Sequence, residues 1–258
     1  MTAGAAGRRN GTARRQARQD LADCYRYLVR LGLMSMFGHV SLRVPGETDL
    51  VYITPIASGI PGEMRAEDIL TITLEGKKVD GEAWVPPEVP MHTWVHRVRA
   101  DAEAVVHCHA LMSTAVAISG TALTPISMHG AVCGDGLPVW DDASMVTTEE
   151  QGKEMAGALG DRAKGLLLRG HGIVAVGASI REALANTFAI EDNAAKFLLA
   201  SLLGTPQRLR ADEMERIRRI TLTPLLFDHF WNYQKRLDRM EQRGTRRRTA
   251  VRSRQGGH

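Results

Sequence analysis

The chain has 258 residues, of which 44% are hydrophobic and 24% are charged, as expected for one soluble globular domain. Its net charge of +4 is uneven: five Arg within residues 1–18 and six within 243–258, with no acid in either segment, leave the rest of the chain at −7. No segment approaches the roughly 18 apolar residues of a membrane span, the N-terminus lacks the apolar centre of a secretory signal, and the three cysteines have no disulfide or zinc-knuckle spacing, so we expect a cytoplasmic protein.

The first half of the chain is predicted to place short strands between helices. Residues 1–15 form a basic tail that we expect to be disordered. Leu21, Cys24 and Leu28 recur at three- and four-residue spacing, which predicts a helix over 16–33 with Gly32 at its C-terminal cap. The pattern further predicts strands over 39–44, 51–54, 69–74 and 101–110, and helices over 90–99 and 111–119.

The second half is predicted to be richer in helix. Thr147 or Thr148 is the expected N-cap of a helix over 148–159. The other predicted elements are strands over 125–128, 165–168 and 173–176, a helix over 180–203, and helix over 213–239 interrupted near Pro224. Residues 241–258 form a second basic tail predicted to be disordered, which leaves 16–240 as the domain. A strand-rich centre with helices at both ends and no strict βαβ rhythm favours a single α/β domain with a mixed sheet.

Two histidines in one apolar strand are the main functional signal. His107 and His109 lie two residues apart in the strand over 101–110, so their side chains point to the same side. His171 lies between two glycines after the apolar run 165–168 and can complete a three-histidine site. Three protein ligands with an open position are typical of a catalytic metal, and imidazole ligands suit Zn, Fe, Ni, Co or Mn. By contrast, we interpret His92 and His96, spaced four apart on a helix, as structural.

A carboxylate between prolines is the candidate acid or base. Glu88 follows Pro86 and Pro87 and precedes Pro90, which stiffens the backbone around it. A carboxylate near a metal is a common proton donor or acceptor. The alternative interpretation is a capping acid at the start of the helix over 90–99.

The motifs, in their order along the chain, resemble the class II aldolase/adducin family over roughly residues 16–205. The matching pieces are Gly38-X-Val40-Ser41, Thr54-Pro55 with Ser58-Gly59, Glu88-X-Pro90-Met91-His92, Val105-Val106-His107-X-His109 and Gly170-His171-Gly172. The resemblance implies a class II aldolase/adducin-like fold, with a mixed central β-sheet flanked by helices. It also implies one divalent metal per subunit, with zinc as the first expectation, held by the three histidines, and Glu88 as the catalytic acid or base.

The resemblance further implies a homotetramer with active sites at the subunit interfaces. His129 falls where aldolases of the family have residues that reach across such an interface, so it is predicted to be catalytic; the alternative is a surface or core histidine. We expect neither a membrane nor a nucleic-acid partner.

Three departures from the sugar-phosphate members of the family concern the phosphate. His39 stands where those members have Asn, Pro86-Pro87 replace two serines that hold the phosphate, and Ile56-Ala57 interrupt the Thr-Pro-Ser-Gly loop. Proline offers neither a hydroxyl nor an N–H group to a phosphate. A non-phosphorylated substrate is therefore expected.

The retained metal ligands and the altered phosphate positions favour a metal-dependent lyase that decarboxylates an aromatic dihydroxy carboxylate. The metal would stabilise the oxyanion, and Glu88 would donate the proton. Substrate contacts are predicted at His39, Ser58, Gly59 and Arg169, with Arg43 and Arg65 as further candidates for a second carboxylate. The alternatives are an aldolase, an aldolase-like iron oxygenase and, as in the adducins, a non-catalytic scaffold.

Overall fold

The computed structural model describes residues 3–56 and 61–255, and describes side chains for residues 10–56 and 62–242. The strands are β1 (His39–Arg43), β2 (Leu50–Ile53), β3 (Leu70–Thr73), β4 (Lys78–Asp80), β5 (Ala104–Cys108), β6 (Val139–Trp140), β7 (Gly165–Leu168) and β8 (Gly172–Gly177). The α-helices are α1 (Ala3–Arg30), α2 (Val89–Val98), α3 (Leu111–Ile118), α4 (Glu149–Leu159), α5 (Ile180–Ser201), α6 (Ala211–Thr221) and α7 (Pro224–Gln255). Three 3-10 helices are η1 (Pro61–Glu63), η2 (Ala66–Asp68) and η3 (His129–Cys133).

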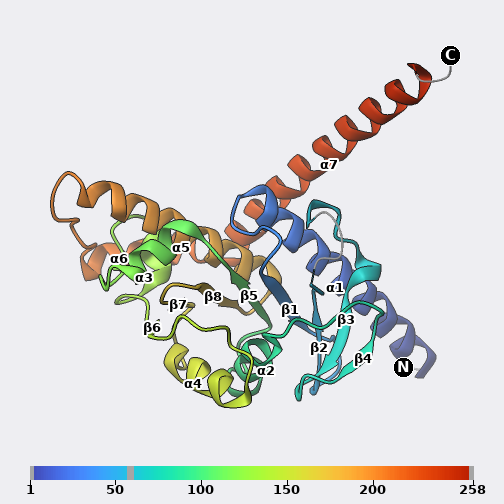
Figure 1. Ribbon diagram of the computed structural model, residues 1–258, viewed down its shortest axis with the longest axis horizontal. Helices are drawn as coiled ribbons and strands as arrows, with labels where there is room; N and C mark the ends of the chain where they lie inside the picture. Colours follow the sequence, from blue (N-terminus) through green and yellow to red (C-terminus); the bar gives the residue numbers. More distant parts are fainter. Residues whose placement is uncertain (1–2, 57–60, 256–258) are drawn as a thin grey trace.

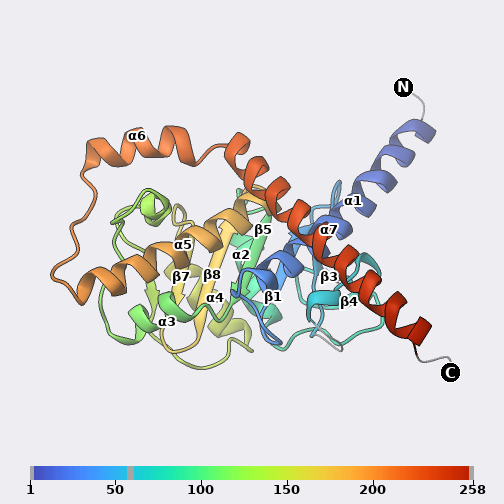
Figure 2. The same ribbon diagram turned by 90° about the horizontal axis from the view of Figure 1, so that it is seen from above.

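The strands of the described residues form one mixed sheet of eight strands in the order β4-β3-β2-β1-β5-β8-β7-β6. β6 and β7 pair in parallel, and the other neighbouring strands pair antiparallel. The helices form layers on the two faces of this sheet (Figure 1). Helices α1, α5 and α7 lie together over one face (Figure 2), and α2 packs with α4 on the other. The predicted α/β domain with a mixed sheet flanked by helices is therefore confirmed.

The alternation of side chains along β5 divides the core between these two faces. Ala104, Val106 and Cys108 belong to the cluster packed beneath α1 and α5, whereas Val105 belongs to the cluster beneath α2 and α4. Successive side chains of a strand point to opposite faces. His107 shares its face with Val105 and therefore lies on the α2 side of the sheet.

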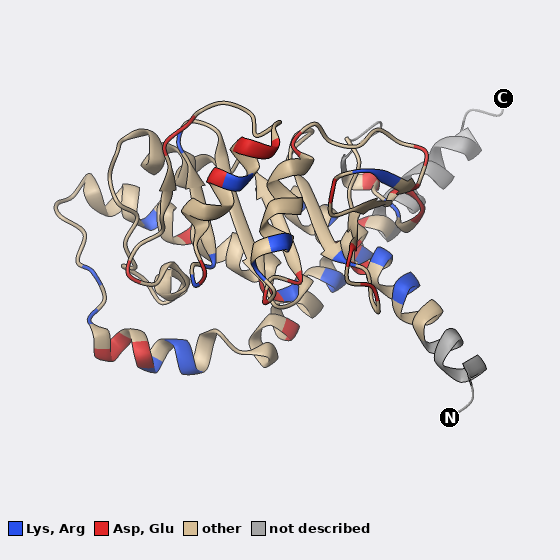
Figure 3. Ribbon diagram, turned by 90° about the horizontal axis from the view of Figure 1, so that it is seen from below, with Lys and Arg blue, Asp and Glu red and all other residues tan. Residues whose placement is uncertain are grey.

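Most predicted elements are present, with shifted ends. Thr148 is the N-cap of α4: its hydroxyl accepts from the N–H of Gln151. Gly32 follows the end of α1 with φ +71°, as its predicted capping role requires. Pro224 begins α7 rather than kinking it, since the first turn of a helix does not need the missing N–H. Helix α6 has acids in its first turn and Arg in its last, which favourably matches the helix dipole (Figure 3).

The strand predicted over 125–128 is wrong. The segment is irregular, because a side chain of α5 rather than a neighbouring strand satisfies its backbone. Asn193 Oδ1 accepts from the N–H of Ile126 and from the hydroxyl of Ser127, and its amide nitrogen donates to the carbonyl of Thr124. Pro125 has no N–H to contribute to a ladder.

Both terminal helices extend into the segments for which the sequence predicted disorder. The predicted boundary at residue 15 lies inside α1, where the Arg14 guanidinium donates to the carbonyl of Pro45 and forms an ion pair with Glu47. Ala and Arg are strong helix formers, so the helix whose amphipathic stretch packs against the sheet continues towards the N-terminus beyond that stretch. At the other end, α7 runs on to Gln255; the side chains from residue 243 onward lie outside the described set. No helix in the described part of the chain has the length and hydropathy of a membrane span.

Candidate metal centre

His107 lies on β5, between the neighbouring strands β1 and β8. It pairs in register with His39 of β1 and with Val174 of β8. Its Nδ1 lies 3.0 Å from the carbonyl oxygen of Ile173, and because a carbonyl only accepts, Nδ1 carries the proton. The Nε2 atom of the neutral ring therefore presents a lone pair, and this buried atom has no hydrogen-bond partner among the described residues.

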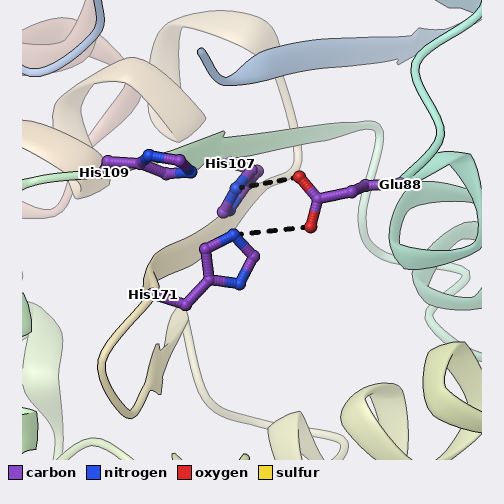
Figure 4. A group of neighbouring side chains, drawn as sticks. All are labelled: Glu88, His107, His109 and His171. Carbon is purple, nitrogen blue, oxygen red and sulfur yellow. Dashed lines mark ion pairs between the residues drawn. The ribbon is translucent and has the colours of Figure 1, made fainter. Parts of the chain in front are cut away.

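The other two predicted histidines converge on His107. His109 follows β5 directly, and His171 lies in the turn between β7 and β8. The ring centroids are 5.1 Å apart for His107 and His109, 4.9 Å for His107 and His171, and 5.0 Å for His109 and His171. The i and i+2 spacing and the glycine-flanked third histidine therefore predicted a real cluster (Figure 4).

Two glycines allow the hairpin to bring His171 to this position. Gly170 has φ +73°, a conformation that favours glycine in the turn. At Gly172 an added Cβ would lie 2.4 Å from the carbonyl oxygen of Cys108, so β8 could not approach β5 as closely with any other residue. Both glycines of the Gly-His-Gly sequence are therefore required for steric reasons.

Glu88 lies at the start of α2 and points at the histidines rather than along its helix. Its side chain forms no capping hydrogen bond, so the capping interpretation is wrong. Oε1 lies 3.4 Å from Nε2 of His171, and Oε2 lies 3.7 Å from Nε2 of His107 (Figure 4). The carboxyl group is buried, and its Oε1 also accepts from the N–H of Val146 at 3.2 Å.

Burial sets the protonation of this cluster. It raises the pKa of Glu88, against the smaller lowering effect of the Val146 N–H. Burial, with His109 nearby, lowers the pKa of His171 to about 4. Burial also lowers the pKa of His107 and of His109. Three neutral imidazoles and one carboxyl group beside them are therefore expected at neutral pH.

The four side chains fit a divalent metal ion. Each offers one ligand atom, and these atoms all lie within 4.8 Å of one another. Nε2 of His107 and Nδ1 of His171 are buried and have no hydrogen-bond partner among the described residues, although buried polar atoms in native proteins normally have one. Neutral imidazole nitrogen suits zinc and the other first-row metals already named. The cluster could thus hold a metal through its histidines, with Glu88 beside it.

Sequence reasoning missed a second group of histidines next to the cluster. His39 Nε2 lies 3.7 Å from Oε2 of Glu88, and its Nδ1 lies 3.2 Å from Nε2 of His92. Ser41 and His96 continue this contact into the interior. The sequence does contain the pattern behind this group. Ser41 lies two residues after His39 and therefore on the same face of its strand, and His92 and His96 lie four residues apart on one face of a helix.

The remaining predicted residues make contacts of their own. Arg169 forms an ion pair with Asp141, and Arg65, 71% exposed in its side chain, pairs with Glu67. His129 Nδ1 lies 2.7 Å from Asp192 Oδ2. Within the described part of the chain, no hydrogen bond or ion pair joins Arg169 or His129 to the cluster, so their predicted roles stay predictions.

Three further candidates are Arg43, Ser58 and Gly59. Arg43 donates to the backbone carbonyls of His96 and Ala102, so its guanidinium holds the end of α2 to the sheet. Ser58 and Gly59 lie outside the described residues.

Comparison with known proteins places this geometry in a family. Residues 19–198 match the family described as Class II Aldolase and Adducin N-terminal domain. The chain is 32% identical to a 3,4-dihydroxyphthalate decarboxylase of Terrabacter sp., over 74% of this chain and 83% of that one. It is 28% identical to rat gamma-adducin, over 67% of this chain and 25% of the adducin. A solved L-fuculose 1-phosphate aldolase superposes with a TM-score of 0.72 at 27% identity, over 81% of this chain and 97% of that one. The protein therefore belongs to the class II aldolase and adducin family.

Proposed function

We propose that this protein is a metal-dependent lyase that removes CO₂ from an aromatic dihydroxy carboxylate. The observation that carries the proposal is the buried carboxyl group of Glu88, which lies 3.4 Å from His171 Nε2 and 3.7 Å from His107 Nε2. This arrangement combines a metal-binding triad with an adjacent proton donor. The similarity to a 3,4-dihydroxyphthalate decarboxylase supports the choice of substrate class.

The metal would be held by His107, His109 and His171. When bound, it supplies a Lewis acid that stabilises negative charge on an oxygen of the substrate. In decarboxylation the bond between the ring carbon and the carboxylate carbon breaks, CO₂ leaves, and the electron pair stays on the ring carbon. Glu88, whose raised pKa favours the protonated form, donates its proton to that carbon and regains one from water.

The surroundings of the cluster support an aromatic, non-phosphorylated substrate. Pro86 and Pro87 precede Glu88 and provide no hydroxyl or N–H group for a phosphate. Phe37, which is 57% exposed, stacks on His109 with ring centroids 6.1 Å apart and an interplanar angle of 19°. This exposed ring beside a predicted metal ligand can pack against an aromatic substrate.

An aldolase is the second candidate, favoured by the superposition with an L-fuculose 1-phosphate aldolase. Retro-aldol cleavage would use the same metal and the same carboxyl group, and would release an aldehyde instead of CO₂. The two reactions are separated by their products.

The test is incubation of the full chain, loaded separately with Zn²⁺, Mn²⁺ and Fe²⁺, with 3,4-dihydroxyphthalate. We expect CO₂ and the monocarboxylic catechol in equal amounts without O₂ consumption. Oxygen uptake would instead indicate the oxygenase. Aldehyde release from a hydroxy-keto substrate, with no CO₂ from the aromatic acid, would indicate the aldolase. A chain that retains none of the three metals would revive the non-catalytic scaffold.

The role of Glu88 has its own test. Glu88→Gln keeps the size of the side chain but removes the transferable proton, so we expect retained metal and a turnover lower by about 10²-fold or more. Glu82→Gln makes the same change at an exposed position and serves as the matched control. Turnover of Glu88→Gln equal to that of the control would refute the assignment.

A further inference from the structure

A continuous line of hydrogen-bonding side chains runs from the cluster into the interior. His39 Nδ1 lies 3.2 Å from His92 Nε2, and Ser41 Oγ lies 2.8 Å from His92 Nδ1 and 2.9 Å from His96 Nε2. The line ends where His96 Nδ1 lies 3.2 Å from the carbonyl oxygen of Ala102. All four side chains are buried, and none is more than 6% exposed. Strand β1 and helix α2 therefore enclose a line without access to solvent along its length.

The carbonyl at the far end fixes the direction of every hydrogen bond. A carbonyl oxygen only accepts, so His96 Nδ1 carries a proton and its neutral ring accepts at Nε2. The Ser41 hydroxyl must then donate to His96, which leaves its oxygen to accept from Nδ1 of His92. The neutral His92 ring therefore accepts at Nε2, and the proton in the final contact belongs to Nδ1 of His39. The hydrogen-bond network thus assigns one tautomer to each ring.

We propose that Ser41, His92 and His96 are positioning residues that hold His39 in its Nδ1–H tautomer, so that Nε2 of His39 accepts a hydrogen bond from a hydroxyl group of the substrate. That Nε2 atom lies 3.7 Å from Oε2 of Glu88, at the edge of the cluster. A catechol offers such a hydroxyl donor next to an oxygen that can bind a metal. The identity of the donor rests on the proposed function, whereas the tautomer rests on the hydrogen bonds alone.

The line is suited to fixing a tautomer rather than to carrying a proton away. A proton moved from His39 to the far end would leave a charged His96 in the interior. Burial and the guanidinium of Arg43 lower the pKa of His96 to about 3, which opposes that charge. His39 is thus kept as an acceptor at the site.

The tautomers can be measured directly by nitrogen NMR on the full chain, labelled with ¹⁵N-histidine and loaded with Zn²⁺. We expect His39, His92 and His96 to carry the proton on Nδ1. His107 is an internal reference, because its Nδ1 donates to the carbonyl of Ile173 independently of this line. A proton on Nε2 of His39 in the unmodified protein would overturn the proposal, and this measurement needs no variant and no substrate.

Ser41→Ala tests the coupling along the line. Without the hydroxyl, Nδ1 of His92 has no acceptor, so we expect the proton of His92 to move to its Nε2. Nδ1 of His39 would then accept from His92, and the proton of His39 would move to its Nε2, which becomes a donor at the site. His96 keeps its bond to Ala102 and should stay unchanged. Ser113→Ala, which also removes a buried serine hydroxyl but lies on α3, is the matched control and should leave all these signals in place.

Turnover then tests the function of the tautomer. With zinc content unchanged, we expect Ser41→Ala to lower kcat/KM for the aromatic acid by about tenfold, the loss of roughly one hydrogen bond. A Ser41→Ala protein that changes the tautomer of His39 but turns over like Ser113→Ala would overturn the role at the site. Failure of both variants and of the unmodified protein to release CO₂ would refute the proposed function and leave the tautomer result intact.

Discussion

The buried imidazole of His96 makes the fold sensitive to acid in a calculable way. Its pKa is lowered from 6.5 to about 3, first by burial and then by the nearby Arg43, with the carbonyl of Ala102 acting against them. Between these two values the unfolded chain binds one proton that the folded chain does not. The stabilisation is complete above 6.5 and is lost progressively as the pH falls towards 3. The loss is about 1.4 kcal/mol per pH unit, hence about 2 kcal/mol on going from neutral pH to about pH 5.

The perturbation that isolates this contribution is His96→Gln. Glutamine can still donate to the carbonyl of Ala102 and accept from Ser41, but it does not titrate. We expect the variant to be less stable at neutral pH, because the side chain fits less well, and to lose about 2 kcal/mol less than the unmodified protein between neutral pH and about pH 5. The exposed histidine variant His229→Gln is the matched control for removing an imidazole.

The assay is urea unfolding of the metal-free protein at several pH values, so that release of a metal does not contribute. The quantity compared is the change in unfolding free energy with pH, not the stability at one pH. An equal pH dependence for the unmodified protein and His96→Gln would contradict the lowered pKa of His96, because it would mean that His96 binds its proton in the folded state.

Two further predictions concern the metal centre. His107→Ala should abolish metal retention in metal analysis, since it removes the central buried ligand, whereas His229→Gln should retain the metal; full occupancy in His107→Ala would show that the site is elsewhere. Gly172→Ala places a Cβ 2.4 Å from the carbonyl oxygen of Cys108 and should destabilise the fold by about 3 kcal/mol in urea unfolding. Its control is Gly157→Ala in α4, where an added Cβ meets open space and should stabilise by about 0.5–1 kcal/mol; equal effects of the two would contradict the close approach of β8 to β5.

The parts of the site that follow local rules could be predicted from the sequence. His107 and His109 converge because residues two apart along extended chain point to the same side, and His171 joins them because its flanking glycines permit the turn and the close strand contact. The alternation along the chain and the glycine turn act within a few residues, whereas the pairing of β8 with β5 that brings His171 to the other two histidines is a long-range contact. The capping role of Thr148 is also local, because it depends on the three residues that follow it.

The parts that depend on distant contacts could not be predicted. The pairing of β1 with β5 sets His39 opposite His107, and no local pattern encodes which strands become neighbours. The segment over 125–128 has the composition of a strand. What keeps it irregular is Asn193, more than sixty residues later, which accepts its hydrogen bonds, and the local sequence does not indicate that contact. The tails were predicted to be disordered because of their charge. In the structure α1 also covers residues 3–15, because its residues after 15 pack against the sheet and the residues before them have high helix propensity.

The register of β5 against β8 also has a consequence for how the protein folds. The contact between His107 and Ile173 closes a loop of 66 residues, and His39 comes from yet another part of the chain. Closing such loops costs chain entropy before the contacts form that offset this cost. The predicted metal ligands therefore come together only when the centre of the sheet is complete. A metal that binds the native state alone should then stabilise it by about 4 kcal/mol at a free concentration of about 1,000 times its Kd. A metal ion held by this cluster would thus add to the stability of the folded chain as well as to the chemistry of the site.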